Sequence, residues 1–103
     1  MFHENDTIIA VPPGETIREQ LALRHMPQKE LAARMGMSEK HISNLINGKV
    51  GLTQETALKL EGVLGIPARF WNQLEAFYQE EVLRIKLGQA QVRLTPARAA
   101  TFQ

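Results

Sequence analysis

Apolar residues recur every three or four positions along most of the chain, which is the period of helices with one buried face. This pattern predicts five helices, over residues 14–25, 28–35, 38–46, 54–64 and 67–87. Proline or glycine lies at the breaks, as at Pro27, Gly36 and Gly65, where a helix ends or a left-handed residue is needed. We therefore expect an all-α domain over residues 1–88, followed by a flexible basic tail over residues 89–103.

Residues 28–49 have the pattern of two short helices joined by a tight turn. The apolar positions of the two helices are Leu31, Ala32, Met35, Ile42, Leu45 and Ile46. Gly36 suits the turn, Ser38 can cap the second helix, and the small side chain of Ala32 permits a close approach. This is the helix-turn-helix pattern, whose second helix enters the DNA major groove. The alternative is a purely structural helical hairpin.

The two ends of the chain leave alternatives open. Residues 1–13 are predicted to form an extended arm, which packs along the domain, pairs with a partner strand or frays. The helix over residues 67–87 has a wide apolar arc, formed by Phe70, Trp71, Leu74, Phe77, Tyr78, Val82 and Ile85. Part of this arc should cover the helices over 14–25 and 54–64. The excess is either a dimer seam or simply core. Gly88 is expected to end the helix.

Composition narrows the function classes. The chain has 103 residues, no cysteine and a formal net charge of +1. The missing cysteine excludes a disulfide scaffold and a thiolate metal site. No apolar run could span a membrane and the first residues lack signal-peptide features, so we expect a cytoplasmic protein. The three histidines are scattered, without a nucleophile elbow or phosphate loop, so we expect no catalytic residue, no metal and no cofactor.

Basic residues are concentrated in two segments of the chain. Residues 28–49 carry four Lys or Arg and two Glu, in addition to His41. Residues 82–103 carry four Lys or Arg and no acidic residue. Any affinity for nucleic acid must come from this local clustering, because the chain as a whole is nearly neutral.

The five predicted helices with a central helix-turn-helix resemble the Xre family of lambda-repressor-like DNA-binding domains. The segment from Pro12 to Tyr78 resembles more closely the HigA-type antitoxins, also called plasmid-maintenance antidote proteins. The blocks SEKHISNLINGK, LTQETALKLE and LGIPARFW carry this resemblance. One departure is Pro27, where such proteins usually have a serine that caps the following helix.

The resemblance implies a transcriptional repressor that binds a double-stranded DNA operator. As an antitoxin it would repress its own operon and neutralise a HigB/RelE-like ribonuclease toxin. A homodimer on a two-fold axis would read a palindromic operator. The toxin could contact the N-terminal arm, the first helix or the basic tail. The alternative is a free-standing Xre-family regulator without a toxin.

Candidate DNA contacts lie on the outward face of the second motif helix. The resemblance to phage repressors implies that Glu39, Lys40 and Asn44 are at base-reading positions, and Ser38 is expected to join them. Lys40 suits guanine and Asn44 suits adenine, while Glu39 could accept from cytosine or only exclude phosphate. The positions expected to contact phosphates or support these readers are Gln28, Lys29, His41, Ser43, Asn47, Gly48 and Lys49, of which the last three resemble a phosphate-contacting segment of the family.

Overall fold

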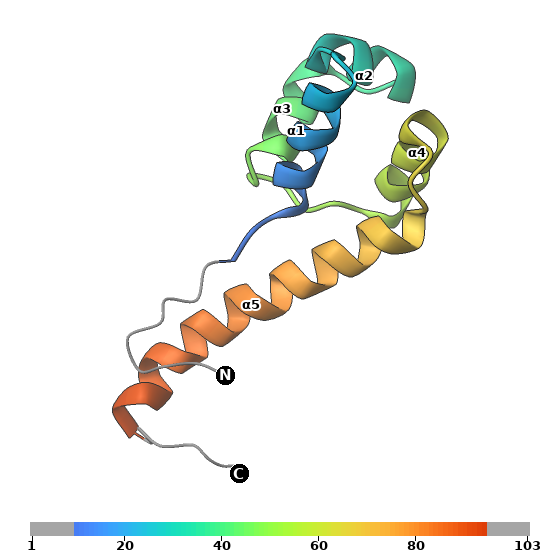
Figure 1. Cartoon of the computed structure of the whole chain (residues 1–103). Helices are drawn as coiled ribbons and strands as arrows, with labels where there is room; N and C mark the ends of the chain where they lie inside the picture. Colours follow the sequence, from blue (N-terminus) through green and yellow to red (C-terminus); the bar gives the residue numbers. More distant parts are fainter. Residues whose placement is uncertain (1–9, 95–103) are drawn as a thin grey trace.

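The computed structural model describes residues 10–94, with side-chain environments described up to Gly88. This part of the chain forms five α-helices and contains no strand: α1 (Pro13–Leu23), α2 (Gln28–Met35), α3 (Glu39–Ile46), α4 (Gln54–Leu64) and α5 (Ala68–Leu94). Helices α1 to α4 gather in one group, and the second half of α5 projects away from it (Figure 1). The predicted all-α fold is confirmed.

Local hydrogen bonds set the ends of the helix-turn-helix pair. Gly36 has a left-handed backbone, with φ at 66°, and the Met37 N–H donates to the Ala32 carbonyl at 2.9 Å to close α2. The Ser38 hydroxyl accepts a hydrogen bond from the His41 N–H at 3.0 Å, which caps α3. Thr53 caps α4 in the same way, through the Thr56 N–H. These ends agree with the sequence predictions.

Helix α1 ends two residues earlier than predicted. The Met26 N–H donates to the Leu21 carbonyl at 2.9 Å, and the His25 N–H donates to the Ala22 carbonyl at 3.2 Å. This pair of bonds places His25 in the left-handed region, with φ at 53°. Glycine usually occupies such a position, so no residue of the sequence indicates a helix end before Met26-Pro27.

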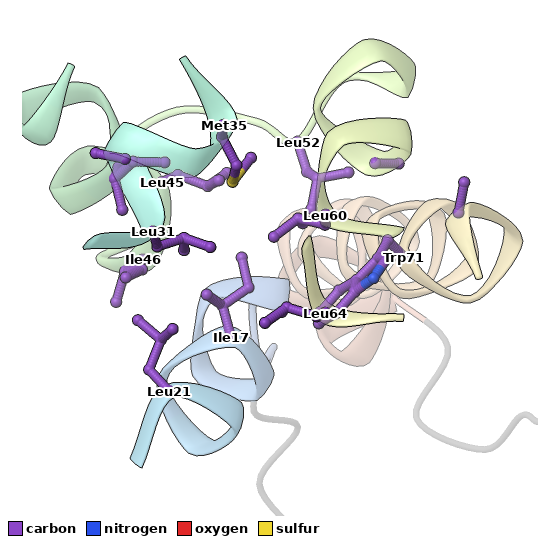
Figure 2. Close-up of a cluster of buried hydrophobic side chains, with 14 residues drawn as sticks. Ile17, Leu21, Leu31, Met35, Leu45, Ile46, Leu52, Leu60, Leu64 and Trp71 are labelled. Atoms are coloured by element: carbon purple, nitrogen blue, oxygen red, sulfur yellow. The ribbon is translucent and has the colours of Figure 1, made fainter. Parts of the chain in front are cut away.

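A single hydrophobic core joins all five helices. Figure 2 shows Ile17, Leu31, Leu60 and Trp71 pointing toward one another from different helices. The side chains with no exposed surface include Ile17, Leu31, Ile42, Ile46, Leu60 and Trp71. The Trp71 indole N–H donates to the Ile66 carbonyl at 3.2 Å, so its polar atom is satisfied inside the core. Ala32 is also buried, as its predicted role requires.

The start of α1 lies directly against the end of α3. A Cβ atom added to Gly14 would be 2.1 Å from the carbonyl oxygen of Ile46. Only glycine therefore fits at this point of α1, because any larger residue would meet backbone rather than a movable side chain. The missing side chain of Gly14 thus allows the close approach of α1 to the end of α3.

The predicted end of the last helix at residue 87 is wrong, because α5 continues through Gly88 to Leu94. Glycine lowers helix stability by about 1 kcal/mol relative to alanine but does not end a helix without a left-handed backbone. The glycines with positive φ in the described residues are Gly36, Gly48 and Gly65. Residues 89–94 of the expected tail are therefore helical, while residues 95–103 lie outside the described range.

The N-terminal arm is described only from residue 10, and residues 1–9 lie outside the described range. The arm was expected to reach residue 13, but α1 begins at Pro13, one residue earlier than predicted. Proline is well suited to the first position of a helix, because its missing N–H would have no partner there.

The wide apolar arc of α5 is only partly used inside the domain. The helix packs against α4 and α1, as predicted, with Trp71 fully buried and Leu74 half-buried against the core. Phe70 and Phe77 remain exposed, Phe77 over 64% of its surface. The explanation of the arc as core therefore holds for Trp71 but not for these phenylalanines.

Candidate nucleic-acid interface

Helix α3 separates its buried and outward residues cleanly. Ile42, Leu45 and Ile46 are buried in the core. The outward positions from the cap to the end of the helix are Ser38, Glu39, Lys40, His41, Ser43, Asn44 and Asn47, all exposed or half-buried. The structure thus brings the predicted base-reading residues together on one face.

Among these residues, Glu39, Lys40 and Asn44 have side chains without an intramolecular hydrogen-bond or ion-pair partner in the described part of the chain. Polar groups of this kind are available to a ligand without breaking an internal bond. Ser38 is different, because its oxygen already accepts the capping bond from His41. Its hydroxyl hydrogen and its second lone pair remain available, so the cap does not exclude the base contact predicted for Ser38.

The backbone directly after α3 forms a hydrogen-bonded turn. Gly48 has φ at 75°, its N–H donates to the Leu45 carbonyl, and the Lys49 N–H donates to the Asn44 carbonyl at 2.8 Å. These two bonds are the usual C-terminal capping pair, and they use the N–H groups that a phosphate would otherwise bind. The N–H groups of Gly48 and Lys49 are therefore not free to bind a phosphate, and Gly48 serves the turn.

Asn47 is held from two sides. Its amide oxygen accepts a hydrogen bond from Arg18 Nη2 at 3.0 Å, and its amide nitrogen donates to Ser43 Oγ at 3.3 Å. Arg18 lies on α1, 29 residues away in sequence. Sequence reasoning did not include Arg18 in the site, because an exposed arginine on another helix carries no local motif.

The start of α2 presents unpaired backbone donors. Pro27 occupies the cap position and makes no side-chain cap. Its carbonyl accepts from the N–H groups of Glu30 and Leu31, which leaves the N–H groups of Gln28 and Lys29 without an intrahelical partner. Gln28 is half-buried and Lys29 is exposed. This helix end has the donors and the dipole that favour a phosphate.

One basic residue of the motif is already paired. Arg34 Nη2 lies 2.7 Å from Glu30 Oε2 on the same helix. Lys29, Lys40 and Lys49 have no ion-pair partner within residues 10–88, so they supply most of the uncompensated positive charge of the motif.

The described residues contain no group of three or more His, Asp or Glu side chains arranged to hold a metal ion. Over residues 10–94, no helix combines the length and apolar character needed to cross a membrane.

Known proteins resemble this chain in both sequence and fold. A family model described as helix-turn-helix matches residues 17–71, more than half of the chain. Antitoxin HigA-1 of Vibrio cholerae is 36% identical over 86 aligned residues, covering 74% of this chain and 81% of that protein. The Escherichia coli HTH-type transcriptional regulator YddM is 35% identical over 63 residues, covering 61% of this chain and 67% of that protein.

A solved structure of another protein has a fold similar to that of this chain. Pseudomonas aeruginosa antitoxin HigA, determined with the higBA promoter, has a TM-score of 0.75 and 20% sequence identity, covering 89% of this chain and 100% of that one. The match to the family model and the identity with the Vibrio cholerae protein carry the assignment. The chain belongs to the Xre-type helix-turn-helix family of DNA-binding regulators, in the group that contains the HigA antitoxins.

Proposed function

We propose that the chain is a sequence-specific repressor that binds its own operator as a homodimer and acts as the antitoxin of a toxin–antitoxin module. The observation that carries the DNA-binding part is the outward face of α3, where Glu39, Lys40 and Asn44 have no side-chain partners among residues 10–88. The HigA homologue and the HigA structure with a promoter support the same function.

In this proposal the N-terminal half of α3 lies in the major groove. Lys40 donates to guanine O6 and N7, and Asn44 pairs with adenine N6 and N7. A well-formed contact of this kind is worth about 1–3 kcal/mol of discrimination against the wrong base. Glu39 accepts from cytosine N4. Ser38 can add its hydroxyl, because the cap of α3 uses only one of the two lone pairs of its oxygen.

Phosphate contacts at both ends of this face hold the helix in register. At one end are the free N–H groups of Gln28 and Lys29, at the start of α2. At the other end are the side chains of Asn47 and Lys49, after α3. His41 and Ser43 lie between the two ends. Such contacts position the protein but do not read sequence.

The homodimer is proposed because one domain offers few contacts. Two copies on a two-fold axis would read a palindrome whose half-sites lie about one DNA turn apart. The proposed seam is on α5, where the exposed side chains of Phe70 and Phe77 line an open groove of about 460 Å³. Exposed aromatic surface of this kind is typical of interaction sites.

The antitoxin part rests on relatedness. The identity with Antitoxin HigA-1 supports a HigB/RelE-like ribonuclease toxin as the partner, bound through a surface away from α3. A second candidate is a free-standing Xre-type regulator, which the match to an HTH-type transcriptional regulator favours. The two differ in whether a neighbouring gene encodes a small toxin.

The test compares the duplex upstream of the gene with a scrambled duplex of the same composition. We expect the wild-type protein to select the upstream duplex. The double variant Lys40→Ala, Asn44→Ala should keep the fold but lose this selection, because it removes the two strongest base contacts. A double variant that still selects its operator would show that α3 is not the reader.

The toxin partnership needs its own measurement. Co-expression with the product of the adjacent reading frame should give a stable complex and relieve growth arrest. A neighbouring product that is harmless, or that is not bound, would favour the free-standing regulator. Sedimentation of the protein without DNA tests the dimer, and a monomer at the concentrations that bind operator would contradict it.

A further inference from the structure

The junction between α1 and the end of α3 brings Arg18 next to the predicted phosphate-contacting residues. Gly14 and Arg18 are four residues apart, so they share one face of α1. Gly14 lets α1 touch the backbone of Ile46, and Arg18 then reaches Asn47 with a 3.0 Å hydrogen bond. Asn47 in turn donates to Ser43, on the outward face of α3. The guanidinium group is therefore held at the rim of the DNA-binding face.

A phosphate at this end of α3 needs positive charge from side chains. The C-terminal end of a helix carries partial negative charge, which repels an anion. The N–H groups of Gly48 and Lys49 are also used inside the turn. Asn47 is uncharged, so Lys49 would be the only cation among the residues first predicted for this end. Arg18 supplies a second cation at the required place.

Within the described part of the chain, Arg18 uses little of its hydrogen-bonding capacity. An arginine has five N–H donors in a planar fork, and the bond to Asn47 uses one of them. Among the described residues the nearest carboxylate oxygen is Glu15 Oε1, at 3.9 Å from Nε, which is too far for a hydrogen bond. The side chain is 48% exposed. The planar group can therefore bind Asn47 on one edge and an anion on another.

We propose that Arg18 completes a phosphate-binding site at the α1–α3 junction, together with Asn47 and Lys49, and that it also orients Asn47. The ligand is a backbone phosphate of DNA, so this inference rests on the proposed DNA-binding function. A phosphate fits better than a base, because Arg18 lies on α1 at the C-terminal end of α3. The N-terminal half of α3 is the part that enters the groove.

The test measures binding of Arg18→Ala to the upstream duplex and to the scrambled duplex at several salt concentrations. A lost phosphate contact weakens both affinities by a similar factor, roughly tenfold, as expected for a hydrogen bond to a charged group. It also lowers the slope of log affinity against log salt by about 0.9 for each bound protomer. Arg18→Lys keeps the charge but not the planar fork, so it should recover the slope and only part of the affinity.

Lys59→Ala is the matched control. Lys59 lies on α4, and its Nζ is 3.4 Å from Glu55 Oε2, so this change also removes one cation near a carboxylate. We expect it to leave affinity and salt slope almost unchanged. Melting temperatures of all variants exclude a loss of folding.

The possible outcomes distinguish a failure of the Arg18 site from a failure of the proposed DNA-binding function. If Arg18→Ala behaves like Lys59→Ala while the wild type binds DNA, the Arg18 site is wrong and the proposed function stands. A loss confined to the upstream duplex would overturn a phosphate contact, because it would indicate base reading. If the wild-type protein binds neither duplex, the proposed function fails together with this site.

Discussion

Gly14 is the most sensitive glycine of the described fold, and Gly14→Ala tests the contact between α1 and α3. The added Cβ would lie 2.1 Å from the Ile46 carbonyl oxygen and 2.6 Å from the Ile46 Cα. The closest ordinary carbon–oxygen contacts are about 3.3 Å, so α1 must move by roughly 1 Å. The obstacle is backbone, which cannot rotate away as the end of a side chain can.

The expected cost follows from two opposing effects. Overpacking costs about 1–3 kcal/mol and occasionally more. Alanine recovers about 0.5–1 kcal/mol relative to glycine in a helix. Because the clash is with backbone, we expect the upper part of the range and a net loss of about 2 kcal/mol. For a domain of this size the melting temperature should fall by roughly 8–16 °C.

The assay is thermal unfolding followed by far-UV circular dichroism, with Gly62→Ala as the matched control. Gly62 is exposed on α4, and a Cβ there has no neighbour within 4 Å. We expect that variant to gain about 0.5–1 kcal/mol from the restricted unfolded chain. If Gly14→Ala melts at the wild-type temperature while Gly62→Ala rises, the close approach of α1 to α3 is refuted.

Two further predictions concern stability. Ala32→Leu adds bulk to a buried position between α2 and its neighbours, so it should lower the free energy of unfolding by about 1–3 kcal/mol; an unchanged midpoint in urea would contradict the close helix packing. His25→Gly should raise the free energy of unfolding by about 1 kcal/mol, because His25 has φ at 53° and glycine adopts this backbone without strain. A lower midpoint for His25→Gly would mean that the histidine side chain stabilises the turn.

The bounds of α2, α3 and α4 could be predicted because they depend on neighbours in sequence. Ser38 and Thr53 accept bonds from N–H groups three residues later, and Gly36 and Gly65 take left-handed backbones. Each of these signals is complete within a few residues, so no knowledge of the rest of the fold is needed. The predicted end of α5 at residue 87 relies on Gly88 as a helix stop. A glycine without a left-handed backbone only weakens a helix, so α5 continues to Leu94.

The candidate site also has one part that local sequence predicts and another part that it does not. Periodicity alone separated the buried Ile42 and Leu45 from the outward Lys40 and Asn44, because a helix of fixed pitch has only one face toward the core. It could not predict that the N–H groups of Gly48 and Lys49 would be occupied by internal bonds. Those bonds change which atoms remain available to DNA.

The sequence by itself determined the all-α class, the helix-turn-helix and its outward face, since these follow from spacing, capping residues and turn chemistry. Tertiary structure decided that Trp71 is buried while Phe77 on the same arc stays exposed. It also decided that Gly14 touches Ile46 and that Arg18 reaches Asn47. These contacts join residues about 30 positions apart, and they depend on the relative placement of whole helices. That placement is set by the packing of the complete core, which no local pattern contains.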